Sequence, residues 1–442
     1  MRKVNKYIIA LLLAFPCSRL FAQENMHPTP PQTGYVTLVN CEIHVGNGQV
    51  IKGDIVFEKG KIVYVGSPES LPTQYTANII DLKGKQVYPG LIATSTNLGL
   101  IEVGSVRATA DFTELGDINP SIRSIVAYNT DSKVINTLRS NGVVLANIVP
   151  RGGIISGSSS VVQLDAWNWE DAAYKMDNGI HFNMPALVNR PNQFGGGGGR
   201  RRQGADEDPV KAGLDRIEGV RKFFREAKAY MANVNPTPVN LKFEAVRGLF
   251  DKSKIFYVHC DLVKEMMVAI DFAKEFDFKT VIVGGSDSWI IADLLHQNDI
   301  PVILSEPHSL PATEDDDVDQ PYKTGAMLQR AGVLFTFCMD AGDGFWQQRN
   351  IPFEAGTMAA YGLTKEEALA AVTSSAAKIL GIEDKTGTVE VGKDANIVVC
   401  DGDLLDMKSS NVIAVYIQGR EINLDNKQKQ LFERYKYKYG IK

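Results

Sequence analysis

Residues 87–100 read VYPGLIATSTNLGL, and this stretch separates two different sequence patterns. Short alternating runs rich in β-branched residues, divided by Gly turns, precede it. Apolar strands alternating with helical segments follow it. The stretch therefore predicts the junction between a small β unit and a larger α/β unit.

The β pattern before this junction reappears near the other end of the chain. YVTLVNCEIHVG, GDIVFEKGKIVYVG and NIIDLKGKQVYPG are typical of antiparallel hairpins, and GTVEVGKDANIVVCDGD and VIAVYIQGREINL share their spacing and turn chemistry. Each end alone has too few short strands to bury a face. We therefore expect residues 35–88 and 384–424 to pack into one composite β-sandwich domain.

The insertion between the two ends, residues 89–383, has the pattern of repeated βα units. Strands are expected at Val143–Val149, Ile255–Val258, Thr280–Val283, Pro301–Leu304 and Val333–Phe337, and helices at Leu262–Phe276 and Lys365–Leu380. The length fits a (β/α)8 TIM barrel, and no Gly-x-Gly-x-x-Gly turn indicates a dinucleotide-binding sheet. The predicted fold class is α/β, a TIM barrel inserted in the composite β-sandwich.

The remaining segments read as extensions of these two units. Residues 1–22 combine a basic start, a short apolar run and a polar end, as a Sec-type signal peptide does, which predicts a periplasmic or secreted protein. A lipid anchor on Cys17 is the alternative. Residues 23–34 are expected to form a flexible, exposed leader that is polar and Pro-rich, residues 189–209 (NRPNQFGGGGGRRRQGADEDP) a flexible barrel insertion, and residues 425–442 a helical tail. No later apolar run has the length of a membrane span.

Composition and charge exclude several classes of function. The chain is 44% hydrophobic and 22% charged, an ordinary globular balance. The first 22 residues carry four Lys/Arg and no acid, so their removal changes the formal charge from −5 to −9. The chain is acidic and has no long stripe of Lys and Arg, which argues against binding to nucleic acid or to anionic lipid along such a stripe. Four scattered cysteines after the signal make no disulfide scaffold; Cys41 and Cys400 fall in segments expected to pack together, and buried thiols are favoured over a bridge.

The junction motif and the segment YGLTKEEALAAVTSSAAKILGIEDKTGTVEVGKDANIVVCDGDLL together resemble the amidohydrolase superfamily, most nearly its imidazolonepropionase-like branch. In that superfamily the first barrel strand follows a Pro-Gly-Leu-Ile turn and carries two metal-binding histidines at i and i+2. The last helix then re-enters the β-sandwich as this second segment does. The resemblance covers nearly all of the chain after the signal, and it implies hydrolysis of carbon–nitrogen bonds other than peptide bonds.

The metal ligands that the resemblance implies are mostly replaced in this sequence. Ser95 and Asn97 stand where the histidine pair belongs, and Gly284 or Gly285 stands at the sixth-strand histidine. The fifth-strand histidine matches His259, and the eighth-strand acid that binds metal and moves the proton matches Asp340. Hydroxyl and amide oxygens are poor zinc ligands, and a catalytic zinc needs about three protein ligands. We expect no tightly held cofactor, and at most a weakly bound divalent metal.

The replacement of these metal ligands affects the catalysis that can be expected. A bound metal lowers the pKa of its water to about 7, which corresponds to roughly 12 kcal/mol relative to bulk water. General-base catalysis by His259 or Asp340 supplies only about 3 to 5 kcal/mol. The sequence therefore predicts that hydrolysis by the zinc route is lost, with His259 and Asp340 as the remaining catalytic candidates.

A ligand pocket is expected to survive at the barrel mouth, where such barrels bind their ligands. Its candidate lining residues are Ser95, Asn97, Asn183, His308, Trp346 and Arg349. Aromatic rings beside an arginine suit a small molecule with apolar and anionic parts. Strand parity predicts that His259 and Asp340 face each other across the lumen and that Cys260 points away from it.

Three hypotheses follow from the sequence. The protein is a metal-poor homologue that binds a small molecule, or an active hydrolase with a site rebuilt around His259 and Asp340, or a non-catalytic subunit of an amidohydrolase complex. The partners implied are a small-molecule ligand and either a second copy or a catalytic amidohydrolase. Nucleic acid and a membrane span are not among them.

Overall fold

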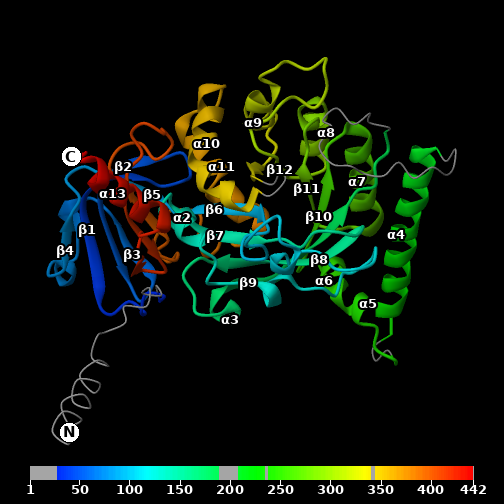
Figure 1. Cartoon of the computed structure of the whole chain (residues 1–442), viewed down its shortest axis with the longest axis horizontal. Coiled ribbons are helices and arrows are strands. Elements are labelled where there is room, and N and C mark those ends of the chain that lie inside the picture. The colour runs from blue at the N-terminus through cyan, green and yellow to red at the C-terminus, as the bar shows by residue number, and fades with distance from the viewer. Residues whose placement is uncertain (1–26, 189–207, 234–236, 340–343, 442) are drawn as a thin grey trace, which may run out of the picture.

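The computed structural model describes residues 27–188, 208–233, 237–339 and 344–441. Figure 1 shows two units side by side, one built on a β sheet whose strands come from near both ends of the described chain, and a barrel-like α/β unit. The α/β prediction, a TIM barrel with a separate composite β unit, is confirmed. Among the helices of the described ranges, none combines the length and the apolar character that a bilayer crossing requires.

The first sheet joins strands from both ends of the chain. Its order is β16-β15-β14-β5-β1-β2-β3, with β4 beside β1. The strands are β1 (Tyr35–His44), β2 (Val50–Glu58), β3 (Lys61–Gly66), β4 (Ile79–Asp81), β5 (Gln86–Pro89), β14 (Ile397–Cys400), β15 (Val412–Ile417) and β16 (Arg420–Glu421). The seam lies between β5 and β14, where Pro89 pairs with Ile397. Leu38, Phe57 and Tyr416 belong to one buried core, so both ends fill the same interior.

The second sheet forms the barrel, in the order β13 to β6. Its strands are β6 (Leu91–Thr96), β7 (Val143–Ile148), β8 (Ile155–Gln163), β9 (Ala173–Asn183), β10 (Ile255–Cys260), β11 (Thr280–Gly284), β12 (Val302–Leu304) and β13 (Phe335–Phe337). Thr94 Oγ1 on β6 donates to Phe337 O on β13 at 3.1 Å, so the two edge strands approach each other and the barrel is nearly closed.

One strand departs from the expected parallel barrel. β8 runs antiparallel to both β7 and β9. Only residues 149–154 connect β7 to β8. A parallel crossover needs a dozen or more residues, so this short connection permits only an antiparallel neighbour.

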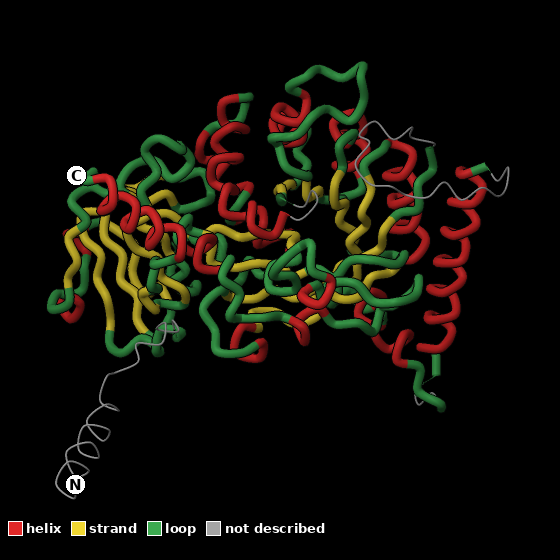
Figure 2. The backbone as a smooth tube through the Cα atoms, viewed as in Figure 1, coloured by secondary structure: helices red, strands yellow, loops and turns green. Residues whose placement is uncertain are grey.

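Helices cover the outside of the barrel strands (Figure 2). They are α2 (Ile135–Arg139), α3 (Trp169–Ala172), α4 (Pro209–Met231), α5 (Leu241–Ala245), α6 (Arg247–Phe250), α7 (Val263–Phe276), α8 (Ala292–Gln297), α9 (Gln320–Arg330), α10 (Ile351–Ala360), α11 (Lys365–Ala371) and α12 (Ser374–Leu380), with α13 (Lys427–Tyr439) beside the first sheet. Short 3-10 turns lie at Pro68–Ser70, Thr73–Tyr75, Arg107–Thr109, Ser124–Ala127, Ser288–Ile291 and Gly344–Asn350 (η7).

The single helix predicted over residues 365–380 is two helices. The capping box of Thr364 and Glu367 starts α11 as expected. The helix then breaks at Val372 and Thr373, where the Thr373 hydroxyl donates back to Leu369 O. The break leaves Val372 O free to accept the backbone N–H of Ile92, which ties the helix pair to the first barrel strand.

The Pro-rich leader is attached to the body from Thr29 onward. The Thr29 amide donates to Asp165, and Gln32 donates to Phe57 O. The described part of the leader is therefore held against the body, whereas its Pro-rich, polar composition predicts an exposed flexible segment.

Candidate functional site

Two histidines meet inside the barrel. His181 on β9 lies opposite Tyr257 on β10, and its ring stacks on that tyrosine at 4.6 Å. Its Nδ1 is 2.8 Å from Nε2 of His259, two residues further along β10. Sequence reasoning retained His259 but missed His181.

Packing on the other strand face shows that this pair points into the lumen. Phe182 and Phe256, which neighbour His181 and Tyr257 in sequence, stack on each other and pack on Phe272 of α7. Side chains alternate along a strand, so the histidines face away from the helices and into the barrel. His181 is 1% exposed, whereas His259 keeps a partly exposed edge.

Both histidines are neutral at physiological pH. Burial lowers the pKa of His181 well below its usual range, and the neighbouring His259 lowers it further. Burial also lowers the pKa of His259 to about 4, and the charge of Arg151 adds to this effect. Two neutral imidazoles share one proton in their hydrogen bond, one ring donating and the other accepting. Nε2 of His181 has no hydrogen-bond partner among the described residues.

The residues at the positions of the family's first histidine pair are buried beside another amide. Ser95 and Asn97, at the carboxyl end of β6, are each 1% exposed. Gln348 from η7 donates to Ser95 O at 3.2 Å and to Met339 O at 2.9 Å. Both amide atoms of Asn97 and the Oε1 of Gln348 lack a hydrogen-bond partner within the described ranges. Buried polar atoms usually have partners, so these amides are candidates for binding a polar molecule.

The sixth-strand position is closed to any side chain. Gly284 has φ +103°, a backbone conformation that residues with a Cβ rarely adopt. A Cβ there would lie 2.7 Å from the Oδ1 of Asp261, which accepts the Ser286 hydroxyl. Gly285 also has positive φ, at +62°. Histidine at either position requires a rebuilt strand end.

The described residues by themselves do not complete a catalytic zinc site. They hold no group of three or more His, Cys, Asp or Glu side chains placed to bind a metal ion. His181 and His259 supply two imidazoles, and Ser95, Asn97 and Gly284 supply no comparable ligand. Asp340 lies outside the described residues, so the predicted contact between His259 and Asp340 stays a prediction.

His308 lies at the rim but is bound to α10. Its Nδ1 is 3.0 Å from Oε1 of Glu354, its backbone N–H donates to Oε2 of the same carboxylate, and its Nε2 is 2.6 Å from the Thr357 hydroxyl. It lines a groove between α10 and residues 403–407. Burial raises the pKa of Glu354 to about 7; the His308 N–H lowers it and the charge of Glu306 raises it.

The other predicted pocket residues have distinct surroundings. Trp346 and Arg349 belong to η7, and the Arg349 guanidinium lies 5.0 Å from the Trp346 ring centre. Asn183 ends β9 and donates to Gly153 O and to the Ser156 hydroxyl. The structure thus brings His259 together with His181, and Trp346 together with Arg349.

Burial raises the pKa of three cysteine thiols, those of Cys41, Cys260 and Cys400. Cys41, Cys260, Cys338 and Cys400 are all buried. Burial raises the pKa of Cys260 well above its usual range, and the charges of Asp261 and Glu265 raise it further. A thiol with a raised pKa is a poor nucleophile at neutral pH.

Comparisons with known proteins agree with this fold. The Amidohydrolase family profile matches residues 290–422. An imidazolonepropionase from Mesorhizobium japonicum is 25% identical over 375 residues, which cover 80% of this chain and 88% of that protein. An amidohydrolase tasK from Hapsidospora irregularis is 21% identical over 83% of this chain, and the match spans only 39% of that longer protein.

Solved structures extend the comparison to three dimensions. An amidohydrolase from Thermotoga maritima MSB8 has a TM-score of 0.73 and 25% identity, covering 88% of this chain and 99% of that one. A molinate hydrolase, with a TM-score of 0.53 and 15% identity, shares the fold. The chain belongs to the amidohydrolase superfamily. Within it, the chain falls on the imidazolonepropionase-like branch.

Proposed function

We propose that this chain is an exported amidohydrolase-superfamily protein that binds a small polar molecule in its barrel and does not use the superfamily's zinc-bound water. The observation that carries the proposal is the neutral His181–His259 pair, held in a lumen where Ser95, Asn97 and Gly284 replace metal ligands. Export rests on the signal-like residues 1–22.

The chemistry of the ligand follows from the groups that face it. His181, Asn97 and Gln348 hold buried donor or acceptor atoms without partners in the described chain, which suit neutral polar groups. Arg151 lies close enough to His259 to lower its pKa, and Arg349 lies on Trp346 at the rim. A small organic acid with an apolar portion matches this combination of cations, amides and aromatic surface.

Two measurements test the proposal together. Protein dialysed against a mild chelator should hold well under one zinc per chain by elemental analysis. A panel of small aliphatic and aromatic carboxylates, screened by thermal shift and followed by calorimetry, should yield a ligand. His259→Ala should weaken that ligand about tenfold or more, as expected for the loss of a buried hydrogen bond. Asp340→Asn should weaken it less, because a carboxylate repels an anionic ligand.

His296 on α8 supplies the matched control. Its Nδ1 is 3.0 Å from Gly332 O, on the outside of the barrel. His296→Ala should leave carboxylate binding unchanged. Near-stoichiometric zinc that survives the chelator would overturn the proposal. So would an equal loss of carboxylate binding in His259→Ala and His296→Ala.

One observation favours the alternative of an active hydrolase: the Nδ1 of His181 lies 2.8 Å from the Nε2 of His259, so the barrel holds a second imidazole. Hydrolysis of cyclic and acyclic amides that is abolished by both His181→Phe and Asp340→Asn would favour it. The third candidate, a non-catalytic subunit, predicts that a catalytic amidohydrolase co-purifies with the chain.

A further inference from the structure

Helix α13 concentrates positive charge in an otherwise acidic chain. Residues 427–439 read KQKQLFERYKYKY, with five Lys or Arg and one Glu. The Asn426 side chain caps the first turn, and Gly440 ends the helix in the left-handed conformation. The Asn426 side chain also donates to the Ser140 hydroxyl, which fastens the start of the helix to the barrel unit.

The helix buries almost none of its own surface. No residue of α13 is buried, and only Leu431 and Lys436 are half-buried. Phe432, Tyr435 and Tyr439 are 64%, 51% and 65% exposed. Isolated helices of this length are marginal in water, and packing of one face normally stabilises them. This face has no such packing within the described chain.

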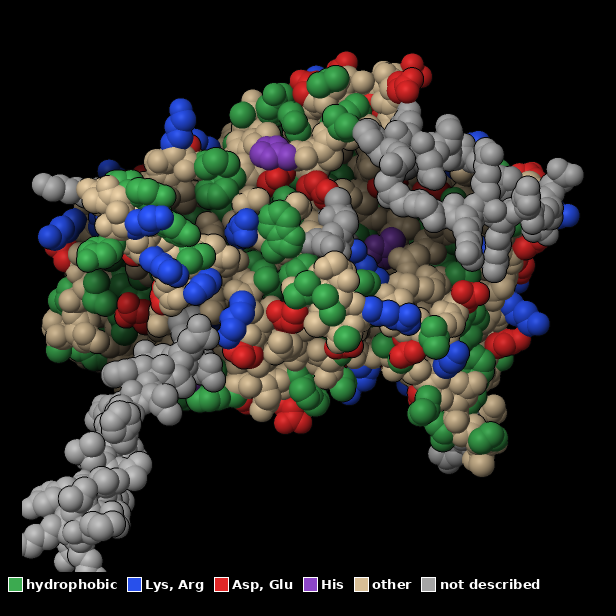
Figure 3. All heavy atoms as spheres, in the orientation of Figure 1, with side chains coloured by type: hydrophobic (Ala, Val, Ile, Leu, Met, Phe, Trp, Pro, Cys, Tyr) green, Lys and Arg blue, Asp and Glu red, His purple; other side chains and the backbone are tan. Residues whose placement is uncertain are grey.

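The exposed rings form one face with cations on both sides. Phe432, Tyr435 and Tyr439 stand at i, i+3 and i+7, on one side of a helix that turns about 100° per residue. The Nζ of Lys438 lies 5.8 Å and 5.1 Å from the centres of the two tyrosine rings. Lys429 and Lys436 fall on the opposite flank. Lys and Arg side chains gather over α13 in Figure 3.

We propose that this aromatic face of α13 rests on the surface of an anionic phospholipid bilayer. Tyrosine and phenylalanine settle at the boundary of headgroups and acyl chains, and flanking lysines bind the lipid phosphates. A second copy fits less well, because a twofold contact would place two helices of the same positive charge against each other. An anionic lipid surface supplies the opposite charge. Lipid binding by α13 does not depend on the function proposed for the barrel.

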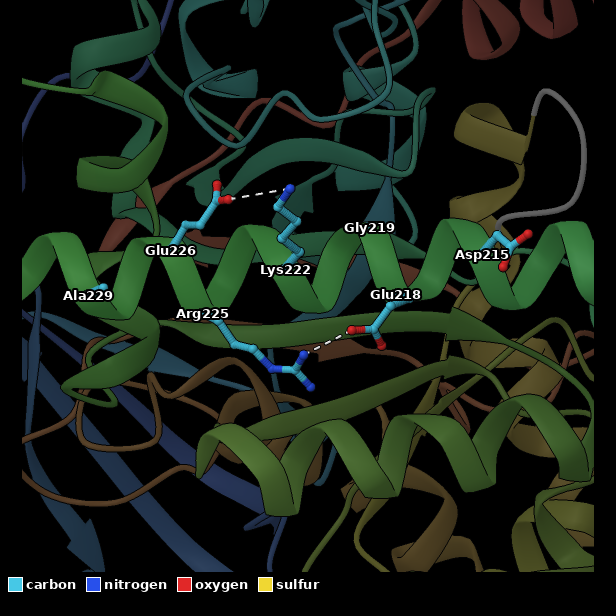
Figure 4. A pocket seen from close by; sticks show the side chains of 7 residues that line it. All are labelled: Asp215, Glu218, Gly219, Lys222, Arg225, Glu226 and Ala229. Atoms are coloured by element: carbon cyan, nitrogen blue, oxygen red, sulfur yellow. Dashed lines mark hydrogen bonds and ion pairs between the residues drawn. The ribbon is translucent and has the colours of Figure 1, made fainter.

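Helix α4 provides an internal contrast. Its exposed face in Figure 4 is also highly charged, but Lys222 pairs with Glu226 and Arg225 with Glu218. Acids and bases alternate there, and no aromatic side chain lines the hollow. A surface whose positive charges are already paired with carboxylates binds lipid phosphates weakly.

Flotation of the full chain with vesicles tests the proposal. Vesicles of three parts phosphatidylcholine and one part phosphatidylglycerol should carry the protein at 50 mM NaCl, and pure phosphatidylcholine vesicles should carry at least tenfold less. Binding should fall at 300 mM NaCl, because salt screens exposed charges. Lys429→Glu with Lys438→Glu should weaken binding about 25-fold or more, at about fivefold per lysine removed.

A second variant and a control complete the test. Replacing Phe432, Tyr435 and Tyr439 by Ser should abolish flotation while leaving the melting temperature nearly unchanged, since these rings touch little of the protein. Lys222 and Lys228 are both exposed on α4, and Lys222→Glu with Lys228→Glu should float as wild type. Salt-independent binding to neutral vesicles would contradict the proposal. So would flotation that survives both α13 variants, single-stranded DNA binding without flotation, or a dimer that either variant dissociates.

Discussion

His44 links the β unit to the barrel through two acceptors. Its Nδ1 is 2.6 Å from Glu366 of α11 and its Nε2 is 2.6 Å from Gln86 Oε1. A ring with an acceptor at each nitrogen is satisfied only as the imidazolium. Burial lowers the pKa of His44, but the hydrogen bonds to Glu366 and Gln86 and the charge of Glu366 outweigh it and raise the pKa.

This geometry predicts a pH-dependent stability. The raised pKa means that the contribution of His44 is complete below about pH 6.5 and is lost as the pH rises through the folded-state pKa. His44→Asn should cost about 1 kcal/mol at pH 6 and much less at pH 9. Urea unfolding at the two pH values measures the difference. An equal cost at both would show that the ring is neutral.

Glu354 is a buried carboxyl group whose raised pKa also makes stability fall as the pH rises, but in a lower pH range than for His44. It is 3% exposed, and its pKa of about 7 exceeds the usual value of 4.5. Its folded form holds a proton more tightly than the unfolded form, so stability is highest below about pH 4.5 and declines between pH 4.5 and 7. The span corresponds to roughly 3 kcal/mol. Glu354→Gln should flatten this decline in chemical denaturation, and an unchanged slope would assign the titration to another group.

At the scale of elements, Gly284 decides what the sixth barrel strand can carry. Gly284→Ala should destabilise by about 2–3 kcal/mol, combining the strain of positive φ with the contact with Asp261. Gly392 is the matched control, since its φ is +92° and a Cβ there meets nothing within 4 Å. Gly392→Ala should therefore cost only the conformational part, about 1 kcal/mol. Equal melting temperatures for the two variants would mean that Asp261 moves freely.

Elements with strong patterns could be predicted from the sequence, and elements with weak ones could not. The runs at 143–149 and 255–258 became β7 and β10 because β-branched and aromatic residues dominate them. β8, ISGSSSVVQ, and β9, AYKMDNGIHFN, carry Gly, Ser and Asn, which weaken a strand signal. These strands form because their neighbours supply backbone partners.

The same reason explains what was missed in the site. His259 stood out through the family resemblance, whereas His181 has no motif around it. Only the register of β9 against β10, with His181 opposite Tyr257, brings its Nδ1 to His259. Register is a tertiary property set by pairing, and no local spacing in GIHFNMP reports it.

At the scale of the whole molecule, a buried ion network joins the two units. Asp165, after β8, accepts from Arg139 of α2 at 2.6 Å and from Arg420 of β16 at 3.0 Å. Its side chain is 3% exposed and the two arginines are 8% and 12% exposed. One carboxylate thus offsets two desolvated cations.

Removing that charge should be costly. Asp165→Asn should lower the unfolding free energy by about 3–5 kcal/mol, because it leaves two buried guanidinium groups without a counter-charge. Asp131→Asn breaks the exposed Lys133–Asp131 pair and should cost under about 0.5 kcal/mol. Calorimetry should show the two units of wild type melting together. Separate transitions in wild type would mean that the network does not couple them.

The seam between β5 and β14 also governs the order of events during folding. Pro89 meets Ile397 only after the whole barrel has been made, and closing a loop of roughly 300 residues is slow. Until then the edge of β5 that faces β14 remains open to pairing with other chains, which is a hazard for any polypeptide in transit. A chain cut short inside the barrel never covers that edge. The first sheet can therefore be completed only after the barrel has been synthesised. Truncated chains should be recognised by their exposed strand edges and degraded.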